Sequence, residues 1–151
     1  MEQLFITDEL MMAIQDMAKN RSKAEVIKHS DRIYSDLKRL TEEALKYKNG
    51  EWLIKTVDRK IGKTYALIKV ACEYQIPIAV KGNDLCRLLE REAKEELGQL
   101  LQTINVNLLN DRRLSRVDIV LKDEGTPVRL IRERLGDNVR IVGICSFFGE
   151  W

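Results

Sequence analysis

Apolar residues in the first fifty positions recur every three or four residues, the spacing of one face of an α-helix. Asn20-Arg21 interrupts this pattern, and Ser22 with Glu25 forms a capping box that opens a second helix. The apolar face of this helix includes Leu37 and Ala44 and continues to about Tyr47, and Asn49-Gly50 is a typical helix end. We therefore predict a helical pair in an N-terminal segment, residues 1–50, which packs on the region that follows or on another copy of the chain.

From residue 51 onward, short apolar runs alternate with helical stretches. The predicted strands are 52–57, 76–80, 103–109, 117–121 and 139–145, and the predicted helices are 63–74, 83–101 and 126–136. The apolar spacing in the helix at 83–101 predicts a buried side that contains Leu85, Leu88, Leu89, Ala93, Leu97 and Leu100. Strands that alternate with helices favour a parallel sheet covered by helices. Residues 51–151 are therefore predicted to form an α/β domain, with a parallel sheet of four or five strands.

Composition narrows the class of protein. Of 151 residues, 44% are hydrophobic and 33% charged, and the net charge is only +2, which does not by itself indicate a nucleic-acid partner. No apolar run approaches the roughly 20 residues of a membrane span, and the first residues lack the pattern of a signal peptide, so we expect a cytoplasmic protein. Cys72, Cys86 and Cys145 are odd in number and far apart, which predicts reduced cysteines. His29 is alone, so chemistry that needs several histidines is excluded.

The junction between the first predicted strand and the helix at 63–74 contains a candidate phosphate-binding loop. Such a loop needs a flexible backbone that donates N–H groups, a lysine for the outer phosphates and a hydroxyl for Mg²⁺. Gly62, Lys63 and Thr64 supply these groups, and the helix that follows directs its N-terminus at the anion. Val57 occupies the first glycine position of G-x-x-x-x-G-K-[ST], so the match is incomplete.

A second junction strengthens this interpretation. The apolar strand around 119–121 continues through Lys122 into Asp123 and Glu124. Two acids at a strand end can hold a Mg²⁺ ion and orient an attacking water, although they can also be solvated loop charges. Both junctions occur at carboxyl ends of predicted strands, where α/β sheets bind ligands. Lys122 departs from the pattern, because an apolar residue is usual at that position.

The stretch Asp58-Arg59-Lys60-Ile61-Gly62-Lys63-Thr64 resembles the variant Walker A loop of phage terminase large subunits and related helicase-like ATPases, and Asp123-Glu124 resembles their Walker B acids. The resemblance implies a minimal phage-type P-loop fold that takes ATP and Mg²⁺. The implied roles are nucleotide binding by Lys60, Ile61, Gly62, Lys63, Thr64 and Tyr65, metal binding by Thr64 and Asp123, catalysis by Glu124, Lys63 and Arg59, and a sensor at Ser146. The candidates for an arginine finger are Arg129, Arg132, Arg134 and Arg140, for which helix-surface charges are the favoured interpretation.

Two other functions compete with a weak Mg-dependent ATPase. The chain can be an inactive P-loop-fold module that binds a protein partner through its N-terminal helices and acts on a replication, packaging or defence machine. It can also be an accessory protein that binds DNA or RNA through Arg112, Arg113 and Arg116, with a solvated loop as the simpler interpretation of that cluster. P-loop ATPases often complete their sites across subunits, so a homo-oligomer is a further expectation.

Overall fold

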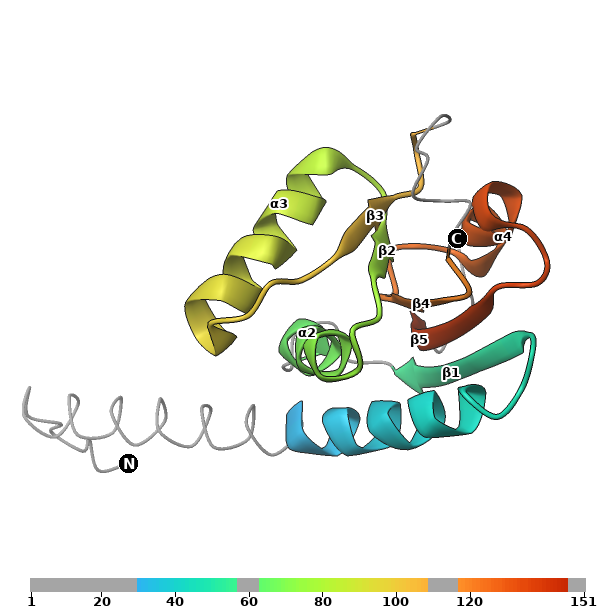
Figure 1. The fold of residues 1–151 in the computed structure, drawn as a ribbon, viewed down its shortest axis with the longest axis horizontal. Helices are drawn as coiled ribbons and strands as arrows, with labels where there is room; N and C mark the ends of the chain where they lie inside the picture. The colour runs from blue at the N-terminus through green and yellow to red at the C-terminus, as the bar shows by residue number, and fades with distance from the viewer. Residues whose placement is uncertain (1–29, 57–62, 109–116, 147–151) are drawn as a thin grey trace, which may run out of the picture.

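The structure is a computed structural model, and it describes residues 30–56, 63–108 and 117–146 (Figure 1). A helix over residues 30–44 comes first. The elements that follow are β1 (Gly50–Thr56), α2 (Lys63–Tyr74), β2 (Ile78–Val80), α3 (Asn83–Glu92), the π-helical turn η1 (Ala93–Leu97), β3 (Thr103–Asn105), β4 (Ile119–Lys122), α4 (Val128–Leu135) and β5 (Arg140–Ser146).

The strands form one five-stranded sheet in the order β1-β5-β4-β2-β3. Every neighbouring pair is parallel, which confirms the predicted α/β class and the parallel sheet. The longest pairing joins β1 to β5, from Gly50 opposite Arg140 to Thr56 opposite Ser146. Because all strands run the same way, the carboxyl ends of β1, β4 and β5 lie at one edge of the sheet.

Helices cover both faces of the sheet. The chain advances in one direction along the sheet from β1 to β2 and from β2 to β3, and in the other direction from β4 to β5. Since parallel crossovers are right-handed, helices of opposite advance belong on opposite faces. One apolar core accordingly joins α2, α3 and the helix of residues 30–44 to one face, and a second core joins α4 to the other.

The helix of residues 30–44 runs beside β1 and packs against α2, which Figure 1 shows end-on, and it shares their core. Leu37 and Ala44 have no exposed surface, which confirms this part of the predicted apolar face. The helix ends at residue 44, before the predicted end near Tyr47, whose side chain is 54% exposed. The first helix of the predicted pair lies outside the described residues, and the domain boundary at residue 50 stays a prediction.

Polar contacts also hold this helix against α2. Glu73 accepts a hydrogen bond from the Tyr34 hydroxyl and forms an ion pair with Lys38 at 3.1 Å. The Tyr34 bond, followed by the Lys38 bond, lowers the pKa of the Glu73 carboxyl. Tyr74 donates to Glu42 Oε1 at 2.6 Å, and burial together with this bond raises the pKa of Tyr74 to about 12.

The helix predicted over 83–101 is shorter than expected. It continues from α3 into η1 and stops at Gly98, whose left-handed backbone (φ 63) ends the helix. Leu100 was predicted on the buried side, but it lies beyond this end and is 86% exposed, whereas Leu101 is buried. Leu88 was placed on the same buried side and is 46% exposed, so that prediction was wrong for both residues.

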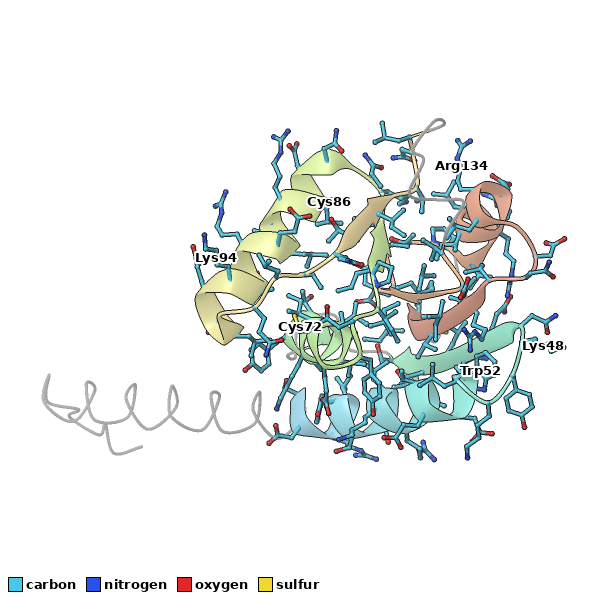
Figure 2. The ribbon with its side chains drawn as sticks, viewed as in Figure 1. Lys48, Trp52, Cys72, Cys86, Lys94 and Arg134 are labelled. Atoms are coloured by element: carbon cyan, nitrogen blue, oxygen red, sulfur yellow. The ribbon has the colours of Figure 1, made fainter. Side chains whose placement is uncertain are left out.

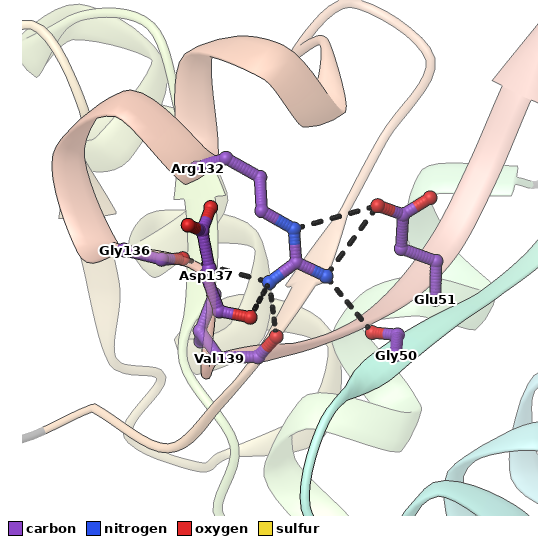
Figure 3. Close-up of polar contacts among 6 residues, drawn as sticks. All are labelled: Gly50, Glu51, Arg132, Gly136, Asp137 and Val139. Carbon is purple, nitrogen blue, oxygen red and sulfur yellow. Dashed lines mark hydrogen bonds and ion pairs between the residues drawn. The ribbon is translucent and has the colours of Figure 1, made fainter.

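Arg132 ties the amino ends of β1 and β5 to α4 (Figure 3). Its Nη1 donates to the carbonyl oxygens of Val139 at 2.6 Å and Asp137 at 2.9 Å. Its Nη2 donates to the carbonyl oxygen of Gly50 at 3.2 Å, and its Nε pairs with Glu51 Oε1 at 3.4 Å. A planar guanidinium can serve two strands in this way because its donors point in fixed, diverging directions.

The three cysteines are free, as predicted. Cys72 and Cys145 are buried, whereas Cys86 is partly exposed. Figure 2 labels Cys72 on α2 and Cys86 on α3. Burial raises the pKa of the Cys72 thiol. Within the described residues, no helix has both the length and the apolar character needed to cross a bilayer.

Candidate functional site

The sheet order brings the two predicted junctions to one edge. Lys63 is the first residue of α2, which follows β1, and Asp123 and Glu124 follow β4 directly. β5 lies between β1 and β4, and its last residue is Ser146. The helices after β1 and β4 cover opposite faces of the sheet. α/β sheets bind ligands at the carboxyl ends of their strands, where the connections change sides.

The two junctions touch through Lys63 and Glu124. Lys63 Nζ donates to Glu124 Oε1 at 3.3 Å, between residues 61 positions apart in the sequence. The side chain of Lys63 is 8% exposed and that of Glu124 is 30% exposed. Removing a lysine ammonium from water is costly unless an opposite charge compensates it. Glu124 is therefore the counter-ion that compensates the buried Lys63 ammonium.

Asp123 stabilises the turn that follows β4. Its Oδ1 accepts hydrogen bonds from the Gly125 N–H and from the Thr126 hydroxyl, both at 3.1 Å. This is an Asx-turn, in which a side-chain oxygen replaces a backbone acceptor and reverses the chain. Asp123 Oδ2 takes part in neither bond. The turn thus fixes the carboxylate and leaves an oxygen of the kind that Mg²⁺ prefers.

The other predicted site residues divide into two groups. Thr64 and Tyr65, in the first turn of α2, are exposed, so the Thr64 hydroxyl can reach a ligand in solvent. Ser146 is partly exposed and lies opposite Thr56 in the β1–β5 pairing. The remaining predicted residues, Arg59, Lys60, Ile61, Gly62, Arg112, Arg113 and Arg116, lie outside the described residues.

Thr56 was not singled out from the sequence. Its Oγ1 is buried and has no hydrogen-bond partner among the described residues, at the point where β1 leads into the candidate phosphate loop. A buried hydroxyl without a partner is uncommon and costs free energy. The sequence holds a weak signal for it, since a threonine at the end of an apolar strand faces the edge where ligands bind.

Lys122, the departure from the Walker B pattern, has no exposed surface. Its Nζ donates to the carbonyl oxygen of Ile144 on β5 at 2.7 Å. Gly143, the pairing partner of Lys122 in the sheet, makes room for it: a Cβ there would lie 2.7 Å from Lys122 Cγ. The polar residue in an apolar strand is thus a buried side chain that bonds the neighbouring strand.

The four arginines considered as fingers have other partners. Arg129 is a helix-surface charge as predicted, 3.9 Å from Glu133 one turn away. Arg132, Arg134 and Arg140 instead donate to backbone carbonyls, Arg134 to Val106 at 2.9 Å. The interpretation as surface charges was wrong for these three, because each guanidinium satisfies carbonyls from a segment distant in sequence.

A second polar cluster follows β2 and β3 at the same edge. Asn105 is 5% exposed, and its Oδ1 accepts from the N–H groups of Gly82 and Asn107, each at 3.0 Å. Its Nδ2 donates to Asn83 Oδ1 at 3.0 Å. These three partners occupy the Asn105 amide group, so its role is to join the two strand ends.

Comparisons of the chain with protein-family models, with curated proteins and with solved structures gave no match.

Proposed function

We propose that this protein binds ATP with Mg²⁺ at the carboxyl edge of its sheet, through a phosphate loop that leads into α2. The observation that carries the proposal is the Lys63–Glu124 contact of 3.3 Å. It joins a lysine at a helix N-terminus to an acid that follows another strand. These are the groups that phosphoryl-transfer sites bring together to neutralise phosphates and to orient a nucleophile.

The local environment of Lys63 also supports an anion site. Lys63 opens a helix of 12 residues that has no acidic residue in its first turn, so the positive end of the helix dipole adds to the ammonium. A phosphate that binds Lys63 would replace the Glu124 carboxylate as the ionic partner of the lysine. A nucleotide phosphate can compensate the lysine as well as the carboxylate does, and it releases Glu124.

In the proposed weak ATPase these residues have separate roles. Lys63 holds the outer phosphates, and the released Glu124 accepts a hydrogen bond from water and orients it. Thr64 and Asp123 are the residues that would hold Mg²⁺, through the hydroxyl and the carboxylate oxygen outside the turn. When bound, the ion supplies positive charge to the phosphate oxygens. Ser146 lies at the end of β5, the strand between the two junctions.

Calorimetric titration with Mg-ATP tests the proposal. The Lys63→Met variant should bind about 10- to 100-fold more weakly than the wild type, the equivalent of losing one charged hydrogen bond. Lys69→Met is the matched control, since Lys69 lies on the same helix with its ammonium 4.3 Å from the Tyr34 ring. Equal affinity of Lys63→Met and wild type, or no binding at millimolar nucleotide, rejects the proposal.

An alternative is a protein-interaction module that keeps this fold without turnover. The observation in its favour is that Glu124 already neutralises Lys63, so the site is compensated without a ligand. Steady-state phosphate release separates the two functions. Turnover that is lost in Glu124→Gln argues for an ATPase, whereas no release above background in the wild type, at nucleotide concentrations that saturate binding, favours the module.

A further inference from the structure

Lys122 ends β4, and its side chain bonds the next strand. Arg140 N donates to Asp118 O at 2.8 Å across the β4–β5 pair. Alternate residues of a strand direct their N–H and C=O groups to the same side, so Ile144 also faces β4. Ile144, however, lies beyond the last paired residue, because Lys122 is opposite Gly143. The Ile144 carbonyl therefore faces a position where β4 has already ended.

The backbone donor for that carbonyl would be the N–H of Glu124. The hydrogen bonds between β4 and β5 recur every two residues along each strand. A continuation of β4 would therefore bring the Glu124 N–H to the Ile144 carbonyl oxygen. Instead, Lys122 Nζ donates to Ile144 O at 2.7 Å. The chain turns away at Asp123, and Glu124 directs its side chain to Lys63.

We propose that Lys122 is a positioning residue. Its ammonium donates to the Ile144 carbonyl in place of the Glu124 N–H, and this frees Glu124 to reach Lys63. This inference rests on the proposed function for its consequence in turnover, but the geometry on which it depends needs no nucleotide. An apolar residue at 122 would leave the Ile144 carbonyl buried without a donor. That carbonyl would then draw the Glu124 N–H into the sheet, and β4 would lengthen at the expense of the turn.

Gly143 is part of the same device. A Cβ at this position would lie 2.1 Å from Lys122 O and 2.7 Å from Lys122 Cγ. The glycine thus keeps clear the space beside β5 that the lysine stem occupies on its way to Ile144. The lysine and the glycine, opposite each other in the pairing, together make β4 end one residue before Asp123.

A double-mutant cycle tests the positioning role without nucleotide. The coupling between Lys63 and Glu124 is obtained from the unfolding equilibria of wild type, Lys63→Met, Glu124→Gln and the double variant. For a contacting pair we expect a coupling on the order of 5- to 100-fold in the equilibrium constant. In a Lys122→Met background it should fall to about twofold or less. Lys55→Met, which changes an exposed lysine on β1, should leave it intact.

A merely structural lysine gives a different result. It would lower the stability of all four proteins and preserve the coupling, and that outcome overturns the proposal. If Lys122→Met does not fold, Lys122→Gln replaces it, because its amide is one bond shorter than the lysine side chain and cannot reach as far. The same two outcomes apply to that variant.

Amide hydrogen exchange on the wild type adds an arm that needs no variant. The Glu124 N–H should exchange much faster than the Ile144 N–H, because Lys122 already bonds the Ile144 carbonyl that the Glu124 N–H would otherwise use. Protection of Glu124 equal to that of Ile144 overturns the proposal.

If the protein hydrolyses ATP, Lys122→Met should lower kcat about tenfold or more while the Kd for Mg-ATP stays within about threefold. Unchanged kcat contradicts positioning. Absence of ATP binding in the wild type rejects the proposed function alone, and the cycle and the exchange rates still decide the role of Lys122.

Discussion

Replacing Gly143 by alanine places a methyl group against the backbone of the neighbouring strand. The added Cβ would lie 2.1 Å from the carbonyl oxygen and 2.9 Å from the nitrogen of Lys122. Carbon and oxygen atoms in adjacent strands ordinarily stay about 3.3 Å apart, so β4 and β5 would have to separate locally by roughly 1 Å. An N–H···O bond of ordinary length does not survive such a separation.

The cost follows from what the separation breaks. Overpacking by one methyl group costs about 1–3 kcal/mol, and each buried group left without its partner adds about 1–3 kcal/mol. β4 has only four residues and cannot spread the distortion along its length. We therefore expect Gly143→Ala to lower the free energy of unfolding by roughly 3–6 kcal/mol, a large part of the 5–15 kcal/mol typical of a folded domain.

Urea unfolding followed by circular dichroism measures this loss. Gly125→Ala is the control, because its Cβ would meet nothing closer than Asp123 Oδ1 at 3.6 Å, and we expect a change under about 1 kcal/mol. Adding Lys122→Ala to Gly143→Ala removes the contact with Cγ but not the one with the backbone, so stability should not recover. A loss below about 1 kcal/mol in Gly143→Ala, with an unchanged denaturant slope, would refute the steric argument.

Three further predictions concern groups away from the site. Arg132→Met should cost about 2–4 kcal/mol in urea unfolding because the carbonyls of Gly50 in β1 and of Val139 just before β5 lose their donor. Arg132→Lys should recover less than half of that loss, since one ammonium cannot span both carbonyls, and full recovery by lysine contradicts the guanidinium geometry. Glu73 has a pKa lowered from its ordinary value of 4.5, so its contribution, roughly 0.2–1 kcal/mol for so exposed a group, should be complete above about pH 5 and fade as the pH falls through the folded-state pKa. The stability difference between wild type and Glu73→Gln should therefore shrink as the pH is lowered from 7 to 2.5. A difference that stays constant over this range would contradict a stabilising role of the ionised Glu73 carboxylate. Cys72, buried and with a raised pKa, should react with iodoacetamide at least about tenfold more slowly than Cys86 in the native protein, as followed by mass spectrometry; equal rates would contradict the packing of α2.

Much of the fold could be predicted because the local spacing of apolar residues indicates where helices and strands form. The alternation of apolar runs with helical stretches identified the elements that form the sheet, including the short β3, and implied that the strands are parallel. The end of the long helix was missed because apolar spacing continues past Gly98 to Leu100 and Leu101. A single glycine in the left-handed conformation outweighed that spacing.

The candidate site could be predicted only as separate pieces. Lys63, Thr64, Asp123 and Glu124 were chosen from residue types at strand ends, and such ends share one edge whenever the sheet is parallel. Which of these strand ends lie next to each other depends on the strand order, and no local sequence pattern specifies that order. The order placed β5 between β1 and β4 and still allowed Lys63 to reach Glu124.

The sequence by itself therefore determined the fold class, the elements and the residue types at each strand end, because these depend on neighbours a few positions away. Only the tertiary structure decided the partners. It showed that Lys122 is fully buried and bonds Ile144. It also showed that Arg132 binds the carbonyl of Gly50 in β1 and that of Val139 just before β5. A charged side chain looks alike in the sequence whether water or a distant carbonyl satisfies it, and packing alone makes that choice.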